Sequence, residues 1–98
     1  MNTNVHGYKR VYNVSVGTVA KAINTNGKRL GLLIRNNDDE NPIYLGGSDV
    51  TAATGFPLLY HEVFQDDDSW DSRYGVVDDW YAIAESTVDV RVIEYNNG

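Results

Sequence analysis

The chain has 98 residues, of which 42% are hydrophobic; it contains no cysteine, and its formal net charge is −6. This length suits one domain with one core, and the absence of cysteine excludes both a disulfide framework and thiolate catalysis. No apolar run approaches the ~18–20 residues of a membrane-spanning helix, and the first residues lack the apolar segment of a signal peptide. We therefore expect a single domain over residues 1–98 that is made in the cytoplasm and contacts no membrane.

Charge is divided unevenly along the chain. Residues 1–37 contain six lysines and arginines and no acid, a charge of +6, whereas residues 38–98 contain all fourteen acids and only two arginines, a charge of −12. Two interpretations stay open: the halves neutralise each other within one domain, or the basic half forms an electropositive face that docks on a partner. We do not expect nucleic acid to be that partner, because no basic cluster alternates with stacking aromatics as in known modules.

The first predicted element covers residues 8–16, which alternate in polarity and suit a β-strand with Val14 and Val16 turned inward. The alternative is that residues 1–12 form an arm that lies across a neighbouring subunit and anchors there through aromatic and basic side chains. Gly17-Thr18 interrupts the pattern. A second short strand is predicted over residues 19–23, and a tight turn follows it.

Residues 28–58 carry the clearest strand signals. Leu30, Leu32 and Ile34 recur with a period of two. Turn-forming residues follow over positions 36–42, and residues 43–45 resume the strand pattern, so a β-hairpin is predicted. A glycine pair then ends the second strand, a loop of small and hydroxyl-bearing residues follows, and Phe56 is expected to close one end of the core.

Residues 58–65 predict another strand, and residues 59–79 form an acidic, aromatic region that we expect to project from the domain. Residues 80–84 and 88–95 predict a final hairpin. No segment of ten residues has the helical period. The predicted fold is all-β: a single small β-sandwich or closed β-barrel of about seven or eight short antiparallel strands. Its predicted core consists of Leu30, Leu32, Ile34, Ile43, Leu45, Ile83, Val90 and Val92.

No catalytic constellation is found in the sequence. His61-Glu62 begins like a zinc-protease motif, but Gln65 stands where the second histidine is required. Gly46-Gly47-Ser48 lacks the lysine and helix of a phosphate-binding loop. The aspartates at positions 66–68 suit calcium by their chemistry but not by EF-hand spacing, so a solvated acidic loop is the expectation. We expect no enzymatic activity, no cofactor and no metal.

Two blocks of the sequence resemble a known family. The first comprises Gly-Leu-Leu-Ile-Arg-Asn-Asn at residues 31–37, Asn-Pro-Ile-Tyr-Leu-Gly-Gly-Ser-Asp-Val-Thr at 41–51 and Thr-Gly-Phe-Pro-Leu at 54–58. The second comprises residues 80–94, a closing segment rich in alternating valines. Both are similar to segments of small virion proteins of tailed bacteriophages. Residues 59–79 depart from that family, which has a short turn at this place.

The resemblance implies a compact β-sandwich or barrel that serves as a capsid decoration protein or as the base domain of a head fibre or tail adhesin. We expect a structural, non-enzymatic decoration protein on the capsid surface. Its expected partners are the major capsid protein and further copies of itself, as a trimer. The expected contacts with the shell are Tyr8, Lys9, Arg10 and Tyr12. The expected contacts between subunits are Ser48, Asp49, Val50, Thr51, Gly55, Phe56 and Pro57.

An alternative hypothesis is a carbohydrate-binding or receptor-adhesion module of a phage fibre or tail. Aromatic rings beside carboxylates can stack on sugar faces and accept hydrogen bonds from sugar hydroxyls. The expected ligand platform consists of Trp70, Asp71, Tyr74 and Asp78. Packing within the core or an interface is the competing interpretation of these rings.

Overall fold

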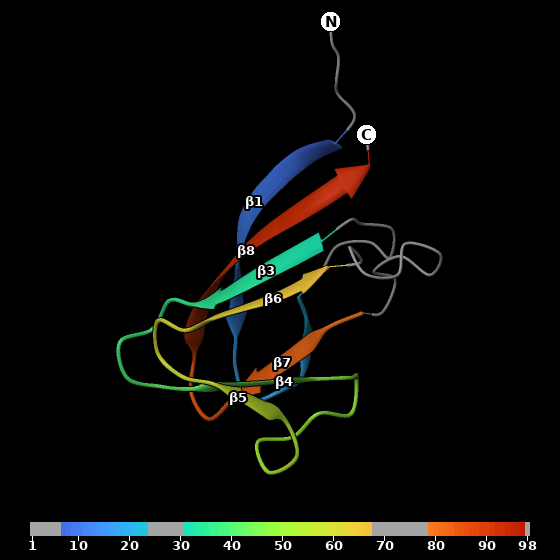
Figure 1. Cartoon of the computed structure of the whole chain (residues 1–98). Coiled ribbons are helices and arrows are strands. Elements are labelled where there is room, and N and C mark those ends of the chain that lie inside the picture. The colour runs from blue at the N-terminus through green and yellow to red at the C-terminus, as the bar shows by residue number, and fades with distance from the viewer. Residues whose placement is uncertain (1–6, 24–30, 68–78, 98) are drawn as a thin grey trace, which may run out of the picture.

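The computed structural model describes residues 7–23, 31–67 and 79–97, and all of its regular structure in these ranges is β-strand (Figure 1). In this described part of the chain, eight strands form two antiparallel sheets. Their bounds are β1 Gly7–Val16, β2 Lys21–Ala22, β3 Gly31–Asn36, β4 Ile43–Gly46, β5 Phe56–Leu58, β6 Val63–Asp67, β7 Tyr81–Ala84 and β8 Val88–Asn97. Within the described ranges, no helix is long and apolar enough to cross a membrane.

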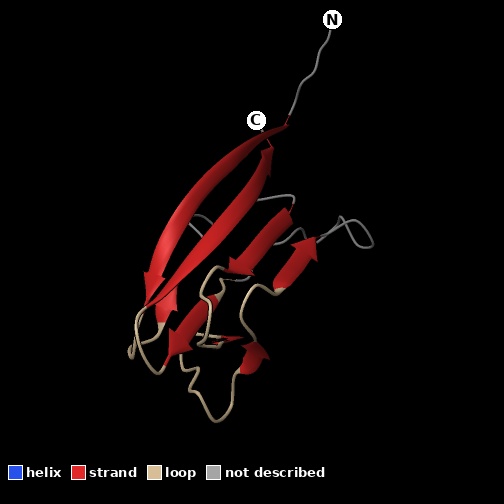
Figure 2. Ribbon diagram, turned by 90° about the vertical axis from the view of Figure 1, so that its left-hand side faces the viewer, coloured by secondary structure: helices blue, strands red, loops and turns tan. Residues whose placement is uncertain are grey.

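The long sheet has the order β1-β8-β3-β6, and the short sheet has the order β2-β7-β4-β5. In both views the long ribbon of β1 and β8 extends beyond the other strands toward the two termini (Figures 1 and 2). In the described part of the chain the sheets do not close into a barrel, because β1 and β6 are the edges of the long sheet and β2 and β5 are the edges of the short one. Of the two predicted architectures, the closed barrel is therefore wrong.

Both predicted hairpins are wrong in their pairing, although their strands exist. The connection over residues 37–42 carries the chain from β3 in the long sheet to β4 in the short one. The connection over residues 85–87 likewise leads from β7 to β8 in the other sheet. Among the described strands, only β4 and β5 are both consecutive in the chain and neighbours in one sheet. The predicted strand over residues 58–65 is also divided, because a turn at residues 59–62 separates β5 from β6.

The core lies between the two sheets. It is built from every second residue along each strand, the residues whose side chains point inward. Those with at most 1% exposure include Leu32, Ile34, Ile43, Leu45, Val90 and Val92, as predicted. Ile83 was wrongly assigned: it is half-buried on the outer face of β7, and Ala82 and Ala84 point inward instead. Small residues allow β7 to approach the long sheet closely, so the larger Ile83 lies outside. Leu30 lies outside the described residues.

Asn36, the last residue of β3, is a buried polar hub. Its side chain has no exposed surface, and its Nδ2 donates to the carbonyl oxygens of Asn41 at 2.8 Å and Leu58 at 2.9 Å. Its Oδ1 accepts from the backbone N–H of Asp38 at 3.0 Å. Its own backbone bonds to the turn at residues 59–62. Because every polar atom of Asn36 has a partner, the cost of burying it is offset, and the two sheets are joined at this end.

Candidate functional site

The outer face of the long sheet combines apolar and basic side chains. Along β1, β3 and β8, even-numbered residues from 12 onward point into the core and odd-numbered residues point outward. The strand register places Val11, Ile93 and Leu33 in one row across three adjacent strands. Val11 is 69% exposed, and the other two are half-buried. An apolar row on the solvent side of a sheet is a candidate contact surface.

Basic residues flank this apolar row on both sides. One neighbouring row contains Lys9 beside Tyr95, and the other contains Arg91 beside Arg35. The carboxylate of Asp89 accepts from Arg91 Nε at 2.9 Å and from Asn37 Nδ2 at 3.1 Å. Because the ion pair is solvent-exposed, it contributes little to stability. Lys9, Arg35 and Arg91 outnumber the carboxylates of these rows, Asp89 and, opposite Gly31 on β6, Asp67.

The predicted shell contacts lie on β1, which is an edge strand paired with β8 over its whole length. Lys9 and Arg10 are exposed, and the Arg10 guanidinium lies 5.8 Å from the centre of the Tyr12 ring. Tyr12 is half-buried against the core, and its hydroxyl donates to the Ile23 carbonyl at 2.9 Å. Its ring therefore links β1 to the short sheet. Tyr8 lies in β1, opposite Asn96.

This pairing bears on the proposed N-terminal arm. Residues 7–12 are registered against β8, from Gly7 opposite Asn97 to Tyr12 opposite Val92. The edge-strand interpretation therefore describes residues 7–16, and residues 1–6 lie outside the described ranges. Deleting residues 1–12 would remove more than half of a sheet strand, so point substitutions test contacts of this segment more cleanly. Contact with a neighbouring subunit or shell stays a prediction.

The predicted subunit-contact loop divides into a packed part and an exposed part. Val50 is 6% exposed, and a Cβ added to Gly46 or Gly55 would lie 2.8 Å from its Cγ2. Glycine at these two positions therefore lets the loop fold against β4. Thr51 is exposed, and its hydroxyl lies 2.8 Å from that of Thr54. Ser48, Asp49, Phe56 and Pro57 are exposed.

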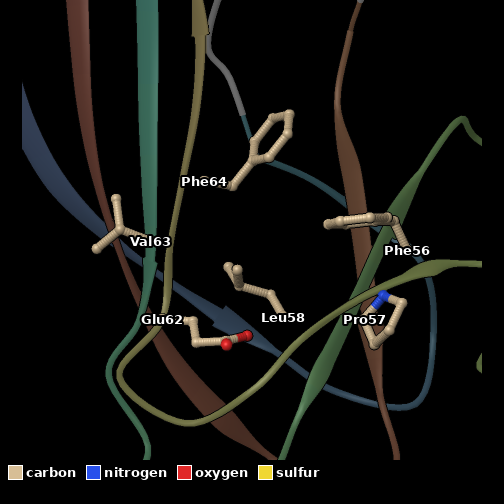
Figure 3. A pocket seen from close by; sticks show the side chains of 6 residues that line it. All are labelled: Phe56, Pro57, Leu58, Glu62, Val63 and Phe64. Atoms are coloured by element: carbon tan, nitrogen blue, oxygen red, sulfur yellow. The ribbon is translucent and has the colours of Figure 1, made fainter.

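Phe56 was wrongly expected to close the core, because 61% of it is exposed. It borders a groove of about 330 Å³ between β5 and β6, which is lined by Phe56, Pro57, Leu58, Glu62, Val63 and Phe64. Figure 3 shows Phe56 and Phe64 on opposite sides of this groove, with Val63 on the other face of β6. The two phenyl centres are 6.2 Å apart. β5 is an edge of the short sheet, and no described strand pairs with its outer side. The ring of Phe56 is therefore open to solvent.

His61 lies in the turn between β5 and β6 and joins two charged side chains. Arg35 Nη2 is 3.0 Å from His61 Nδ1, and Asp39 Oδ1 is 3.0 Å from His61 Nε2. The two ring nitrogens of His61 therefore lie between a guanidinium and a carboxylate. His61 has a φ of 64°, which is unusual outside glycine. These exposed groups hold the turn in place.

The expected ligand platform of the adhesion hypothesis cannot be placed, because Trp70, Asp71, Tyr74 and Asp78 all lie outside the described residues. The nearby Trp80 is half-buried. Its ring meets that of Phe64 with 5.0 Å between centres, and its Nε1 donates to Asp66 Oδ2 at 2.7 Å. Among the described residues, no group of three or more histidines, aspartates or glutamates has a geometry that could hold a metal ion.

Sequence reasoning missed the outer-face row formed by Leu33 and Ile93, although the signal was present. Both residues occupy the outward parity of strands whose inward parity is apolar. A strand that is apolar on both parities is covered on both faces or offers one face to a partner. The register that brings these residues beside Val11 could not be read from the sequence.

Comparison of the chain with family models, with curated proteins and with solved structures finds no match.

Proposed function

We propose that the two sheets form a β-sandwich that acts as a structural docking module on the outside of a tailed-phage head, as a decoration protein. The observation that carries this proposal is the outer face of the long sheet. There the apolar row of Val11, Ile93 and Leu33 lies between basic residues. Interfaces combine such an apolar centre with a polar or charged rim. The resemblance of residues 31–58 and 80–94 to small virion proteins is the reason for proposing the capsid shell as the partner.

The proposed mechanism is stabilisation of the shell. The outer face of the long sheet is buried only when an assembled shell is present to bind it. Each docked copy stabilises the assembled state over the dissociated one, because it binds the former and not the latter. Attraction between the basic rim and an acidic shell surface would speed docking. That attraction weakens as salt rises, because the screening length is only ~8 Å at physiological ionic strength.

The test is binding of the purified chain to heads of the encoding phage that have been stripped of minor proteins. Wild type should sediment with the heads, and its occupancy should fall with added salt. The double variant Val11→Asp/Arg91→Ala should dock at least tenfold more weakly. Both side chains are exposed, so the variant should keep its circular dichroism spectrum and melting temperature.

A matched control is Ser86→Asp/Thr87→Ala, which makes the same kinds of change at exposed positions in the β7–β8 connection. It should dock like wild type. Failure of wild type to bind heads would overturn the proposal. So would binding to bacterial envelope polysaccharide that Trp70→Ala/Tyr74→Ala abolishes, because that result would establish the adhesion hypothesis instead.

A further inference from the structure

Two lateral sides of the molecule carry opposite charge. The basic side consists of β1, β2 and the connection over residues 17–20. Lys9 and Lys21 are exposed there, and residues 7–23 contain no acid. The acidic side consists of β5, β6 and the turn at residues 59–62. Residues 56–66 contain Glu62, which is exposed, and Asp66, which is half-buried, and neither lysine nor arginine. Arg35 of β3 reaches this side at His61, where Asp39 also lies.

The strand order separates these two sides. β1 and β2 are edges of their sheets, and β6 and β5 are the opposite edges of the same sheets. Tyr12 links β1 to the segment after β2, and the groove joins β5 to β6. The uneven charge along the chain therefore becomes an uneven charge across the molecule. Neutralisation between these two edges within one copy is limited by the two inner strands of each sheet, which separate them.

Exposed apolar side chains gather on the same two sides. Among the described residues, large hydrophobic side chains that are exposed lie at seven positions, and only Tyr95 is on neither side. Val11 and Val19 are on the basic side, with 69% and 77% exposure. Phe56, Leu59, Tyr60 and Val63 are on the acidic side, with 48–61% exposure. Each side also ends in strands that have no outer neighbour among the described strands.

From this complementarity we propose that the chain associates with further copies of itself head to tail, the basic side of one copy against the acidic side of the next. The partner is a second copy because the same molecule presents both halves of the match: opposite charges, apolar side chains and open strand edges. Such a contact is heterologous, so it closes into a ring or continues as a filament. The basic side shares Val11 and Lys9 with the docking face, but the contact between copies needs no shell.

The first measurement is sedimentation of the purified chain over a concentration series up to about 1 mM, without phage heads. Wild type should associate as concentration rises, and added salt should weaken the association. Two variants each block one side. Val19→Glu/Lys21→Glu reverses the basic side, and Leu59→Lys/Val63→Lys reverses the acidic side; all four side chains are exposed.

Each blocked variant alone should associate at least tenfold more weakly than wild type. Mixed in equal amounts, they should associate again, because one variant keeps the acidic side intact and the other keeps the basic side intact. Controls are Ser86→Lys/Thr87→Lys and Ser86→Glu/Thr87→Glu, which change net charge away from both sides and should associate like wild type. If a double variant does not fold, the single changes Lys21→Glu and Leu59→Lys replace it, with the same complementation expected.

Three results would overturn the proposal. A wild-type chain that stays monomeric throughout the series shows that the sides do not attract each other. Continued pairing of either blocked variant with itself shows a symmetric interface. A mixture of the two variants that forms no complex shows that the two sides are not partners. Because no heads are present, these outcomes are separate from failure of docking.

Discussion

Two neighbouring regions reverse the usual distribution of polar and apolar side chains. At the end of β3, the amide of Asn36 is fully buried. On the side formed by β5 and β6, the ring of Phe56 and the side chain of Val63 are at least half exposed. Asn36 is tolerated because all its polar atoms are bonded within the chain. The exposed apolar side chains of Phe56 and Val63 are not covered within one copy of the chain. The two regions therefore differ in where their partners lie: inside the molecule for Asn36, and outside it for the exposed side chains.

The largest effect should come from removing the buried amide. Asn36→Ala leaves the carbonyl oxygens of Asn41 and Leu58 without their donor and the N–H of Asp38 without its acceptor. We expect a loss of about 2–4 kcal/mol in the free energy of unfolding, because each unsatisfied buried group costs about 1–3 kcal/mol. Urea unfolding measures it. A loss below about 0.5 kcal/mol would show that water replaces the amide, and the contrast with the exposed side would disappear.

A smaller loss is expected where the loop approaches β4. A Cβ at Gly55 would lie 2.6 Å from Tyr44 Cβ and 2.8 Å from Val50 Cγ2. Gly55→Ala should therefore destabilise the fold by about 1–3 kcal/mol, as overpacking does. Gly17→Ala is the control, because a Cβ there meets nothing within 4 Å. Equal melting temperatures for the two variants would contradict the packing of this loop, which positions Phe56 at the groove.

Acid should weaken the junction around Asn36 through Asp38. Backbone N–H groups of Asn41 and Glu40 donate to the Asp38 carboxylate and lower its pKa below the ordinary 3.8. A lowered pKa means that the contribution of Asp38 is present above 3.8 and is lost as pH falls through the folded-state pKa. The stability gap between wild type and Asp38→Asn should therefore narrow below pH 3.8. A gap that stays constant from neutral pH to pH 3 would refute this assignment.

The smallest effect on folding should come from the exposed side. Val63→Thr changes a side chain that is 50% exposed, so the free energy of unfolding should shift by no more than about 0.5 kcal/mol. The same substitution should weaken self-association, because the methyl groups face the proposed neighbour. A large loss of stability in dilute solution would place Val63 inside the fold rather than at a contact, and the comparison of the two regions would fail.

Much of the fold could be predicted from local pattern. The alternation of Leu32 with Ile34 and of Val90 with Val92 is a property of each strand alone, and these residues are buried as predicted. Pairing could not be predicted in the same way. A strand has the same alternation whether it returns beside its predecessor or crosses to the opposite sheet. Here the crossing is held by the bonds of Asn36 to segments distant in sequence.

Prediction of the candidate site met the same limit. The basic and aromatic character of β1 was apparent from the sequence, and Lys9 is exposed. That Tyr12 bonds to the carbonyl of Ile23 depends on how the two sheets meet. For β7, residue size misled the prediction, since Ile83 is larger than Ala82 and Ala84 and was expected inside. The space left between two closely approaching sheets decides that question, and no single strand encodes it.

The position of β8 has a consequence for synthesis of the chain. It is the last of the described strands to be made, yet it lies between β1 and β3 and pairs with both. Until it leaves the ribosome, β1 has no neighbour in the long sheet, and β3 lacks one of its two. Pairing across such long sequence separations is slow, and unpaired strand edges promote aggregation. We therefore expect a nascent chain truncated before residue 88 to remain dependent on chaperones, and folding to be completed only after synthesis of its C-terminal residues.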